Sequence, residues 1–243
     1  MIASPTYDGS VRKEYMQSIL HMTDYFRSEG IAFELLLEPA TVLHVMRSVM
    51  ASKALRDEDI THLLFVDTDM GFPVDAVRKL IRSGKDVIGC ACPFRTIPLH
   101  DTVSQSGGSF RKAISEILPY ALKFPPGTAT IDIAGGICEV TGIGTGLLLI
   151  SKQALKIMQD KGGLGTFAAR FPYSQWYSGE TYFGFFEHVI VDGAYLGEDY
   201  SFCHRRTESC GGKVYALVDE EIMHIGPLPV LGRYIDKLKA GKL

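Results

Sequence analysis

The sequence lacks any apolar run that could cross a membrane, and it has no strong excess of either charge. Its longest apolar stretch, Ile143–Ile150, has only the length of a strand, whereas a membrane-spanning helix needs about 20 apolar residues. With 25 basic and 28 acidic residues the net charge is −3, which gives no general attraction to nucleic acid or to anionic lipid. The N-terminus shows no basic region followed by an apolar one. We therefore expect no secretory signal, no transmembrane segment, no nucleic-acid partner and a cytoplasmic location.

Cysteine is sparse, and its spacing does not suit a metal site. The five cysteines are an odd number and include no C-x-x-C pair. We expect them to be reduced, and we interpret most of them as small apolar residues of the core. The remaining composition, with 46% apolar and 22% charged residues, is that of an ordinary globular protein and excludes a disordered or low-complexity chain.

Two common phosphate-binding motifs are also missing. No G-x-x-x-x-G-K-[ST] segment is present. Gly142-Ile143-Gly144-Thr145-Gly146 is similar to part of a dinucleotide-binding fingerprint, but it leads into an apolar strand pattern, whereas that fingerprint needs a helix N-terminus at the pyrophosphate. We therefore expect these glycines to allow a close backbone approach to a ligand, or a bulge.

What the sequence does have is a regular alternation of strand and helix patterns in its first half. Strands are predicted over Met1–Pro5, Ile31–Glu38, Thr61–Asp67 and Lys85–Cys92, and helices over Val11–Ser28, from Thr41 as N-cap to Leu55, and from Pro73 to Ser83. This alternation is typical of an α/β fold, with a mostly parallel central sheet flanked by helices on both faces. In such folds ligands bind beyond the carboxyl ends of the strands.

The pattern is less regular after Pro93. We expect residues 96–130 to form long loops around one helix, and two or three strands to follow within Ile131–Ile150. The remaining predicted elements are a helix capped by Ser151, a hairpin over Tyr182–Tyr195 with its turn at Val191-Asp192-Gly193, a helix from Asp199 and a strand over Lys213–Val218. Since neither a linker nor an internal repeat divides the chain, we predict one domain over residues 1–243.

Two carboxylates follow the strongly apolar predicted strand, in the segment Asp67-Thr68-Asp69. Residues two apart in an extended segment face the same side, and two carboxylates there repel unless a cation lies between them. Mg²⁺ and Mn²⁺ prefer oxygen ligands and also bind diphosphate. The segment is therefore a candidate metal site for a nucleoside diphosphate, and a solvated turn after a strand is the alternative interpretation.

Glu198-Asp199 and His224 are further candidates. Acidic residues favour helix N-termini, so Glu198-Asp199 is either a helix-capping pair or the source of a carboxylate base for an acceptor hydroxyl group. His224 lies between apolar neighbours, so it is either a core residue or a neutral imidazole ligand that turns back toward the metal.

Taken in order, these features resemble a GT-A-fold glycosyltransferase of the family-2-like kind. The resemblance extends over roughly residues 3–226 and lies in the segments 3–9, 46–48, 61–70, 87–95, 144–146 and 197–199, with His224 as the last feature. It implies a GT-A fold in a single domain. A Rossmann-like nucleotide-sugar-binding half would extend over about residues 1–95, and a mixed acceptor and catalytic half over about residues 96–243.

The resemblance also implies a donor, a UDP- or GDP-sugar, and a metal cofactor, Mn²⁺ or Mg²⁺. The nucleotide-sugar-binding residues that it implies are Pro5, Thr6, Tyr7, Asp8, Arg47, Asp67, Thr68, Asp69, Arg95, Thr145 and Gly146. The metal ligands that it implies are Asp69, Asp67 and His224.

For the transfer step, the resemblance implies that Asp199 is the base for an acceptor hydroxyl, with inversion at the anomeric carbon, and that Glu198 orients the acceptor or the sugar. A retaining outcome stays open. The acceptor would be a carbohydrate, a lipid-linked molecule or a protein. We expect Trp176 and Tyr177 to contact it, and residues 162–180 to close over the site as a lid.

Two other functions remain as alternatives. One is a non-catalytic protein of the same fold that binds a nucleotide sugar. The other is a sugar-nucleotide pyrophosphorylase, which we rank lower because such enzymes usually carry a glycine-rich basic loop where this chain has Ser4–Ser10.

Overall fold

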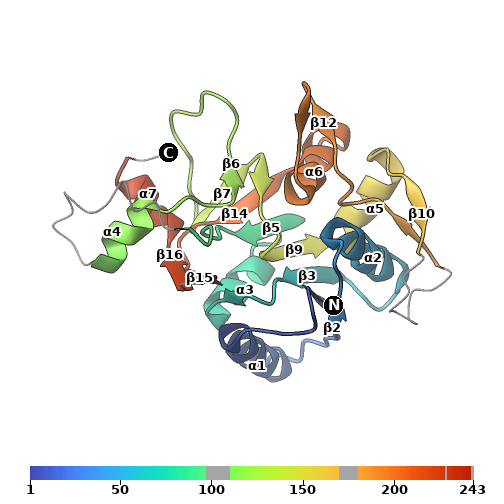
Figure 1. Cartoon of the computed structure of the whole chain (residues 1–243), viewed down its shortest axis with the longest axis horizontal. Helices are drawn as coiled ribbons and strands as arrows, with labels where there is room; N and C mark the ends of the chain where they lie inside the picture. The colour runs from blue at the N-terminus through green and yellow to red at the C-terminus, as the bar shows by residue number, and fades with distance from the viewer. Residues whose placement is uncertain (97–109, 170–179, 228, 242–243) are drawn as a thin grey trace.

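The computed structural model describes residues 1–96, 110–169, 180–227 and 229–241, and a seven-stranded sheet forms its centre (Figure 1). The strand order is β2-β1-β3-β9-β5-β14-β7. The strands are β1 (Ile2–Thr6), β2 (Leu35–Pro39), β3 (His62–Val66), β5 (Val87–Cys90), β7 (Ile137–Val140), β9 (Leu147–Ser151) and β14 (Val214–Leu217). Five of them run in one direction, and β7 and β9 run in the other. The predicted α/β class with a mostly parallel central sheet is confirmed.

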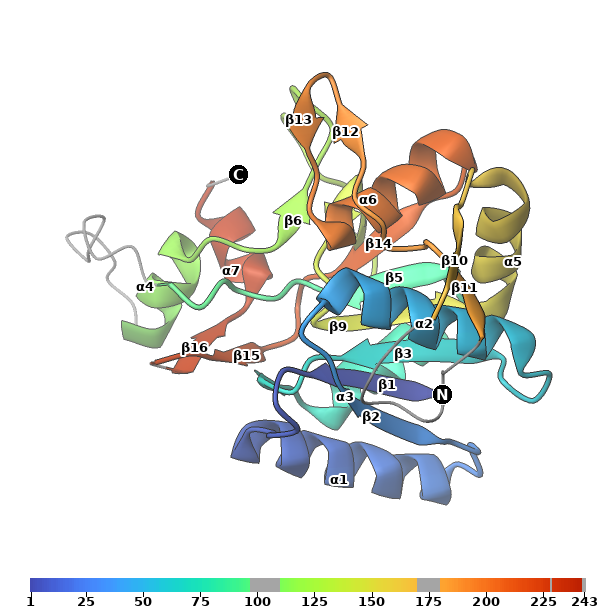
Figure 2. The same ribbon diagram turned by 45° about the vertical axis from the view of Figure 1, so that its right-hand side comes forward.

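Alternate side chains of the strands divide the core into two layers, one on each face of the sheet. Figure 2 shows helices on both sides of the sheet. Ile2 and Leu64 pack against α1 and α3, whereas their neighbours Ala3 and Leu63 pack against α2 and α5. A period of two is expected for strands that are buried on both faces. The helices are α1 (Lys13–Ser28), α2 (Leu43–Arg56), α3 (Val74–Arg82) and α5 (Lys152–Lys161).

Shorter elements extend the sheet layers at the carboxyl ends of the strands and at the edges of the molecule. They are β4 (Met70–Gly71), β15 (Ile222–Ile225) and β16 (Pro229–Gly232) in one antiparallel sheet, the pairs β6 (Leu122–Lys123) with β8 (Gly142–Ile143), β10 (Thr166–Ala168) with β11 (Thr181–Phe183) and β12 (Ile190–Val191) with β13 (Ala194–Tyr195), and the helices α4 (Phe110–Ile117), α6 (Glu198–His204) and α7 (Tyr234–Lys239). A π-helical turn, η2 (Arg205–Ser209), continues α6.

The N-termini of the helices agree with the sequence prediction in one case and differ in another. Ser151 caps α5, because its hydroxyl accepts a hydrogen bond from the amide of Ala154. Thr41 does not cap α2. That helix begins at Leu43 with Val42 in the N-cap position, so the Thr41 side chain lies one residue too early to reach the first free N–H groups.

The predicted hairpin over Tyr182–Tyr195 is also shorter than expected. Only Ile190–Tyr195 forms it, as β12 and β13, and its turn residues Asp192 and Gly193 have φ values of 50° and 76°. Positive φ values at both positions are what a two-residue hairpin turn requires. Tyr182 lies instead in β11, opposite Phe167 of β10.

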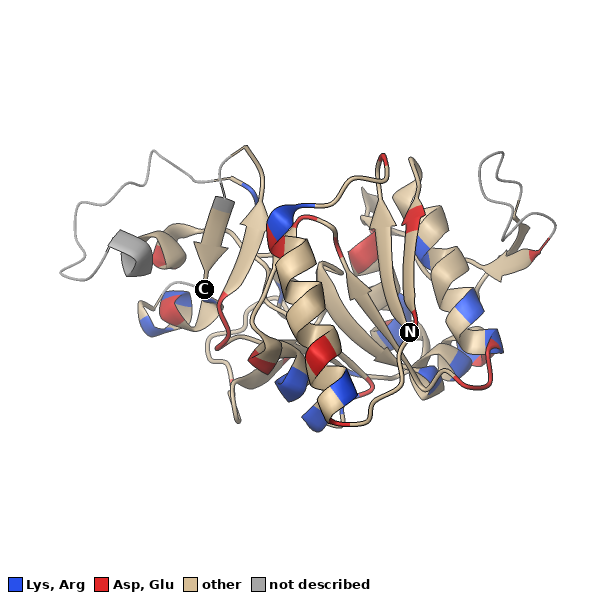
Figure 3. Ribbon diagram, turned by 90° about the horizontal axis from the view of Figure 1, so that it is seen from below, with Lys and Arg blue, Asp and Glu red and all other residues tan. Residues whose placement is uncertain are grey.

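Charged residues of both signs are interspersed along the helices and loops (Figure 3). Within the described ranges, no helix combines the length and the apolar character that crossing a membrane requires. Four cysteines (Cys90, Cys92, Cys138 and Cys203) are buried, as predicted for residues of the core, and Cys210 is partly buried. Burial raises the pKa of the Cys138 thiol to about 11, so this group stays protonated at neutral pH.

The position of β9 is not foreseen by the regular alternation of the first half. It runs antiparallel between β3 and β5, and Leu149 lies opposite both Leu64 and Ile88. Gly89 of β5 makes this arrangement possible, since a Cβ there would lie 2.9 Å from Cδ1 of Ile143 and 3.0 Å from the carbonyl oxygen of Leu147. The first contact is too short for two carbon atoms, so a methyl group at this position would force the end of the Ile143 side chain to move.

We predict that Gly89→Ala lowers the free energy of unfolding by about 1–3 kcal/mol, because the added methyl group overpacks the interface between β5 and β9. Urea denaturation measures this change. Ile143→Val alone is expected to cost about 0.5–1.5 kcal/mol, but it removes the Cδ1 atom that the new methyl group would meet. The double variant is therefore expected to lose less unfolding free energy than the two single variants lose together. Losses that simply add would contradict the packing explanation.

Candidate functional site

The segment Asp67–Asp69 follows β3 directly and is held by three other parts of the chain. The amide of Asp67 donates to the carbonyl oxygen of Gly146 (3.0 Å), the amide of Arg12 donates to that of Thr68 (2.9 Å), and the amide of Ile225 donates to that of Asp69 (2.8 Å). The loop after β1, the turn before β9 and strand β15 therefore meet at the carboxyl end of β3. This is the edge at which α/β folds bind their ligands.

Arg47 of α2 is the most buried charged side chain of this region, with 1% of its surface exposed. Its Nη2 donates to both carboxylate oxygens of Asp67, at 2.9 and 3.2 Å, and its guanidinium carbon lies 5.6 Å from the ring centroid of Phe65. Its Nε and Nη1 atoms are buried and have no hydrogen-bond partner among the described residues. Burial opposes the charge on Arg47, but the carboxylates of Asp67, Asp199 and Glu198 outweigh it and raise its pKa.

Asp69 faces a different pair of partners. Its Oδ2 atom lies 3.1 Å from Nη1 of Arg95 and 3.4 Å from Nε2 of His224. Burial tends to raise the pKa of Asp69, but the nearby imidazole and guanidinium groups more than offset this, and the pKa is lowered. Strand β15 places His224 here because it pairs with β4, with His224 opposite Met70.

The ring of His224 is oriented by the backbone. Its Nδ1 atom lies 2.7 Å from the carbonyl oxygen of Pro93, and a carbonyl oxygen only accepts hydrogen bonds, so Nδ1 carries a proton. Burial acts against a charge on His224, but the hydrogen bond to Asp69 and the charge of that carboxylate outweigh it and raise the pKa of His224. A protonated Nε2 therefore donates to Asp69, and loss of that proton leaves the Nε2 lone pair directed at the same place. A histidine whose second nitrogen donates to a carbonyl group in this way is the usual arrangement of a metal ligand.

The three predicted metal ligands do not form one cluster. Asp67 is bound by Arg47, whereas Asp69 and His224 face each other. Across the described parts of the chain, no group of three or more His, Cys, Asp and Glu side chains is arranged to hold a metal ion. Asp69 and His224 remain as a pair of candidate ligands.

Asp199, in the first turn of α6, is the third acidic group of the site. Its Oδ1 atom accepts a hydrogen bond of 2.6 Å from the hydroxyl of Thr145, which is 1% exposed. Burial raises the pKa of Asp199 to about 6; the positive charge of Arg47 and the hydrogen bond from Thr145 act against this rise, and the negative charges of Glu198 and Asp67 add to it. A carboxylate with a pKa near neutrality is suited to accept a proton.

The end of β1 and the loop after it, which hold four of the predicted nucleotide-sugar-binding residues, lie beside these groups. Pro5 and Thr6 end strand β1, and the Thr6 hydroxyl accepts a hydrogen bond from the amide of Gly9 (2.8 Å). Asp8 accepts hydrogen bonds from the amide and hydroxyl groups of Ser10, and Tyr7 is 77% exposed. Gly146 is buried against Met70 and Cys92, where a Cβ would lie 3.2 and 3.3 Å from their sulfur atoms.

The structure thus brings together Arg47, Asp67, Thr68, Asp69, Arg95, Thr145, Gly146, Glu198, Asp199 and His224. Trp176 and Tyr177 lie outside the described residues, as does most of the predicted lid 162–180. Sequence reasoning placed Pro93 at a strand end beside the site but did not foresee its contact with His224, and it did not identify Phe65 as part of the site. The first acts through its backbone carbonyl group and the second through a ring in the core, and neither contact leaves a signal in the sequence.

No protein-family model and no curated protein sequence matches the chain. Among solved structures, the chain is similar to A197 from STIV, with 16% identity over 96% of this chain and 93% of that protein, and a TM-score of 0.50. At this identity the likeness concerns the fold alone.

Two weaker likenesses are to glycosyltransferases. One is involved in the glycosylation of the major capsid of PBCV-1 (14% identity, 65% of this chain and 63% of that one, TM-score 0.31). The other is GalNAc-T7, solved with UDP, GalNAc and Mn²⁺ (11% identity, 93% of this chain and 44% of that one, TM-score 0.45). Both are too distant to support an argument about this chain.

We predict that Asp67→Asn lowers the free energy of unfolding by about 3 kcal/mol, because it leaves the buried Arg47 guanidinium without its closest counter-charge. The double variant Arg47→Met/Asp67→Asn is expected to recover most of this loss, since it removes the buried charge as well. Urea denaturation gives both values.

The matched control is Asp75→Asn, which removes an exposed ion pair with Arg78 and is expected to cost less than about 0.5 kcal/mol. Equal losses for the two aspartates would show that Asp67 is no more than a surface partner of Arg47.

Proposed function

We propose that this chain is a metal-dependent glycosyltransferase that moves a sugar from a nucleoside diphosphate sugar, a UDP- or GDP-sugar, to a hydroxyl group of an acceptor. The observation that supports this most strongly is the shared environment of Arg47. The same buried guanidinium group is bound by Asp67 and interacts electrostatically with Glu198 and Asp199. Two acidic motifs that are far apart in the sequence therefore belong to one site at the carboxyl ends of the strands.

The donor would bind across the ends of β1 and β3. Pro5, Thr6, Tyr7 and Asp8 form the loop that would hold the base, and Asp67 has carboxylate surface open to a ribose hydroxyl group. Since Arg47 is almost fully buried, it would serve the donor by fixing Asp67 in place. Arg95, with 56% of its side chain exposed, is the accessible cation for the diphosphate.

The residues present fit an Mn²⁺ or Mg²⁺ ion at Asp69 and His224. Asp69 offers an ionised carboxylate, and the contact with Pro93 directs the Nε2 lone pair of a neutral His224 toward the same place. A site with one or two protein ligands is usual for these ions, because substrate phosphates and water occupy the other positions. When bound there, the ion supplies Lewis-acid stabilisation of the charge on the departing diphosphate.

Asp199 would act as the base. Thr145 binds Oδ1, and a Cβ at Gly144 would lie 3.7 Å from Oδ2, so glycine keeps space open beside the second oxygen. The acceptor hydroxyl would give its proton to Asp199 as its oxygen bonds to the anomeric carbon, while the bond from that carbon to the diphosphate oxygen breaks. This single displacement inverts the configuration, and Glu198 would orient the acceptor.

For the metal, we predict that Asp69→Ala or removal of divalent ions by EDTA lowers the rate of diphosphate release by about 100-fold or more, because stabilisation of the leaving group is lost. Calorimetric titration with UDP and GDP, with and without Mn²⁺, gives a second readout that does not depend on turnover. In Asp69→Ala, Mn²⁺ is expected no longer to strengthen nucleotide binding.

Asp160→Ala, which changes an exposed aspartate on α5, serves as the control and is expected to leave both measurements unchanged. Nucleotide binding that responds equally to Mn²⁺ in the Asp69→Ala variant would refute the metal assignment. A protein that binds donor with Mn²⁺ but releases no diphosphate with any acceptor is the non-catalytic alternative.

For the base, we predict that the transfer rate falls about tenfold per pH unit below pH 6 and is level above it, because Asp199 must be ionised to take the proton. Asp199→Asn is expected to keep donor binding and lower transfer by about 100-fold or more. Rate measurements from pH 4.5 to 8 with saturating donor test both statements.

Substitutions of two residues next to Asp199 test whether the fall in rate at low pH, the acid limb of the pH profile, is caused by protonation of Asp199. Glu198→Gln removes a negative charge and should move the limb to lower pH, whereas Thr145→Val removes a hydrogen bond to the ionised form and should move it to higher pH. If neither variant moves the limb, another group is the base.

A further inference from the structure

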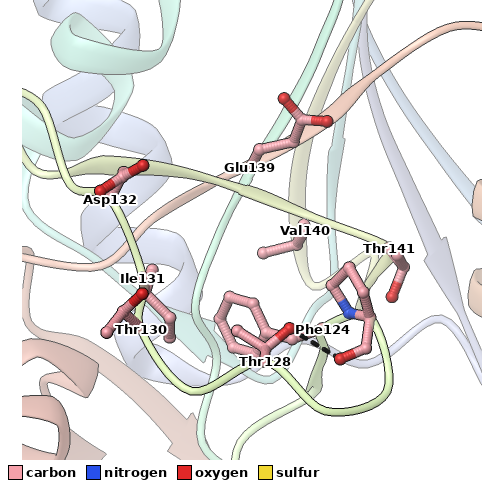
Figure 4. Close-up of a pocket in the computed structure, with 9 residues that line it drawn as sticks. Phe124, Thr128, Thr130, Ile131, Asp132, Glu139, Val140 and Thr141 are labelled. Atoms are coloured by element: carbon pink, nitrogen blue, oxygen red, sulfur yellow. Dashed lines mark hydrogen bonds between the residues drawn. The ribbon is translucent and has the colours of Figure 1, made fainter.

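A cavity of about 260 Å³ lies outside the proposed donor site, beside strands β6 and β7 (Figure 4). Its walls come from residues 124–132 and 139–141. In Figure 4 the carboxylates of Asp132 and Glu139 lie along one edge, and Phe124 and Thr128 lie along the opposite one.

The cavity combines hydrogen-bonding groups with an apolar floor. Carboxylate groups from Asp132 and Glu139 and hydroxyl groups from three threonines line it, together with the apolar side chains of Phe124, Ile131 and Val140. Phe124 and Ile131 pack against the main core, and the Phe124 ring stacks on Tyr234 with the ring centroids 6.3 Å apart. The floor is therefore fixed by the core, whereas the polar groups stand at the rim.

Some of the polar groups are already oriented, and others have no partner among the described residues. Nζ of Lys213 binds Oε2 of Glu139 at 2.7 Å, and the Thr128 hydroxyl donates to the carbonyl oxygen of Pro125 at 2.7 Å. Thr128 thus offers only its lone pairs to a ligand. Within the described residues, the side chains of Asp132, Thr130 and Thr141 form no hydrogen bond, and Asp132 and Thr130 are exposed to solvent.

We propose that this cavity binds one neutral sugar unit. Sugar hydroxyl groups would donate to Asp132 and Glu139 and exchange hydrogen bonds with the threonine hydroxyls, while the apolar C–H face of the ring packs on the Phe124 side. Each sugar hydroxyl has one proton to donate, so a rim rich in acceptors is the complement of a polyol. The volume lies just below the range of about 300–1,000 Å³ for drug-sized ligands, which suits a smaller molecule such as one hexose.

The lining argues against two other ligand classes. A phosphate or carboxylate ligand would face two carboxylates, and none of the nine lining residues is Lys, Arg or His. A metal ion that has no substrate phosphate to complete its coordination would need at least a third charged or imidazole ligand in this place, and no such group is found among the described residues. The charge of Glu139 is in addition already neutralised by Lys213.

The cavity is close enough to Asp199 to belong to the same substrate. Thr141 lines the cavity, and Gly144, three residues later, lies beside Asp199. Three residues span at most about 11 Å, which is within the length of a short oligosaccharide. The role as an acceptor subsite rests on the proposed glycosyl transfer; the binding of a sugar does not. In this role the cavity identifies the acceptor as a carbohydrate chain whose inner unit is bound here.

The test uses the full chain and saturation-transfer NMR with D-glucose, D-galactose, D-mannose and N-acetylglucosamine at millimolar concentrations. At least one of these sugars is expected to bind. Thr130→Tyr, which fills the cavity from an exposed position, and the double variant Asp132→Asn/Glu139→Gln are each expected to weaken binding at least tenfold. Asp160→Asn, an exposed carboxylate elsewhere, should leave it unchanged. Thermal unfolding of each variant verifies that it is folded.

Three outcomes would overturn the proposal. The first is that none of the four sugars binds. The second is that a sugar binds but is displaced by UDP or lost in Asp69→Ala, and is not affected by Thr130→Tyr; the third is that Ca²⁺, added as CaCl₂, binds in the cavity and the sugars do not. The acceptor role has its own readout. Thr130→Tyr should raise KM for an oligosaccharide acceptor without changing the rate at which donor is hydrolysed by water. If donor is never cleaved but sugar still binds in the cavity, glycosyl transfer is wrong and the sugar site stands.

Discussion

The burial of Arg47 is the constraint on which the rest of the site depends. A guanidinium group that is removed from water loses several kcal/mol of hydration, and a carboxylate 2.9 Å away returns about 6 kcal/mol at an effective dielectric constant of about 20. The pair therefore comes close to breaking even, and two of its nitrogens still lack partners. Only further negative charge makes the position favourable. Glu198 and Asp199 at the start of α6 supply that further negative charge.

The electrostatics of the site follow from this arrangement. Arg47 stabilises the ionised form of Asp199, although burial keeps the pKa of that carboxyl group near 6. On the other side, Arg95 and His224 stabilise the ionised form of Asp69. The two aspartates of one short segment thus have separate partners, and they would serve separate parts of a donor. The acidic groups of the proposed site are thus Asp67, Asp69, Glu198 and Asp199.

The sequence predicted those parts of the fold and site that depend on local pattern. Asp67 and Asp69 were expected at a strand end because an apolar strand precedes them, and Ser151 was recognised as a cap because serine precedes a helical pattern. The sequence left open whether His224 turns back toward this segment, and the resemblance to a known family favoured that placement for both His224 and Asp199. The position of β9 and the partners of Asp67 and Asp69 could not be predicted from the sequence, since they depend on contacts between distant segments. The cavity beside β7 was equally hidden, because its lining residues have no common spacing.

The place of β9 also has a consequence for how the protein acquires its shape. Strands β3 and β5 each present an edge to the gap that β9 fills, and β9 is synthesised long after both of them. During translation these edges stay unpaired until residues 147–151 leave the ribosome, and unpaired strand edges are the surfaces through which nascent chains associate wrongly. The first 95 residues are consequently an open half of one sheet, which only the later part of the chain can close. Gly146 precedes β9 and accepts a hydrogen bond from the amide of Asp67, so part of the proposed donor site forms in the same step, and His224 of β15 joins it later.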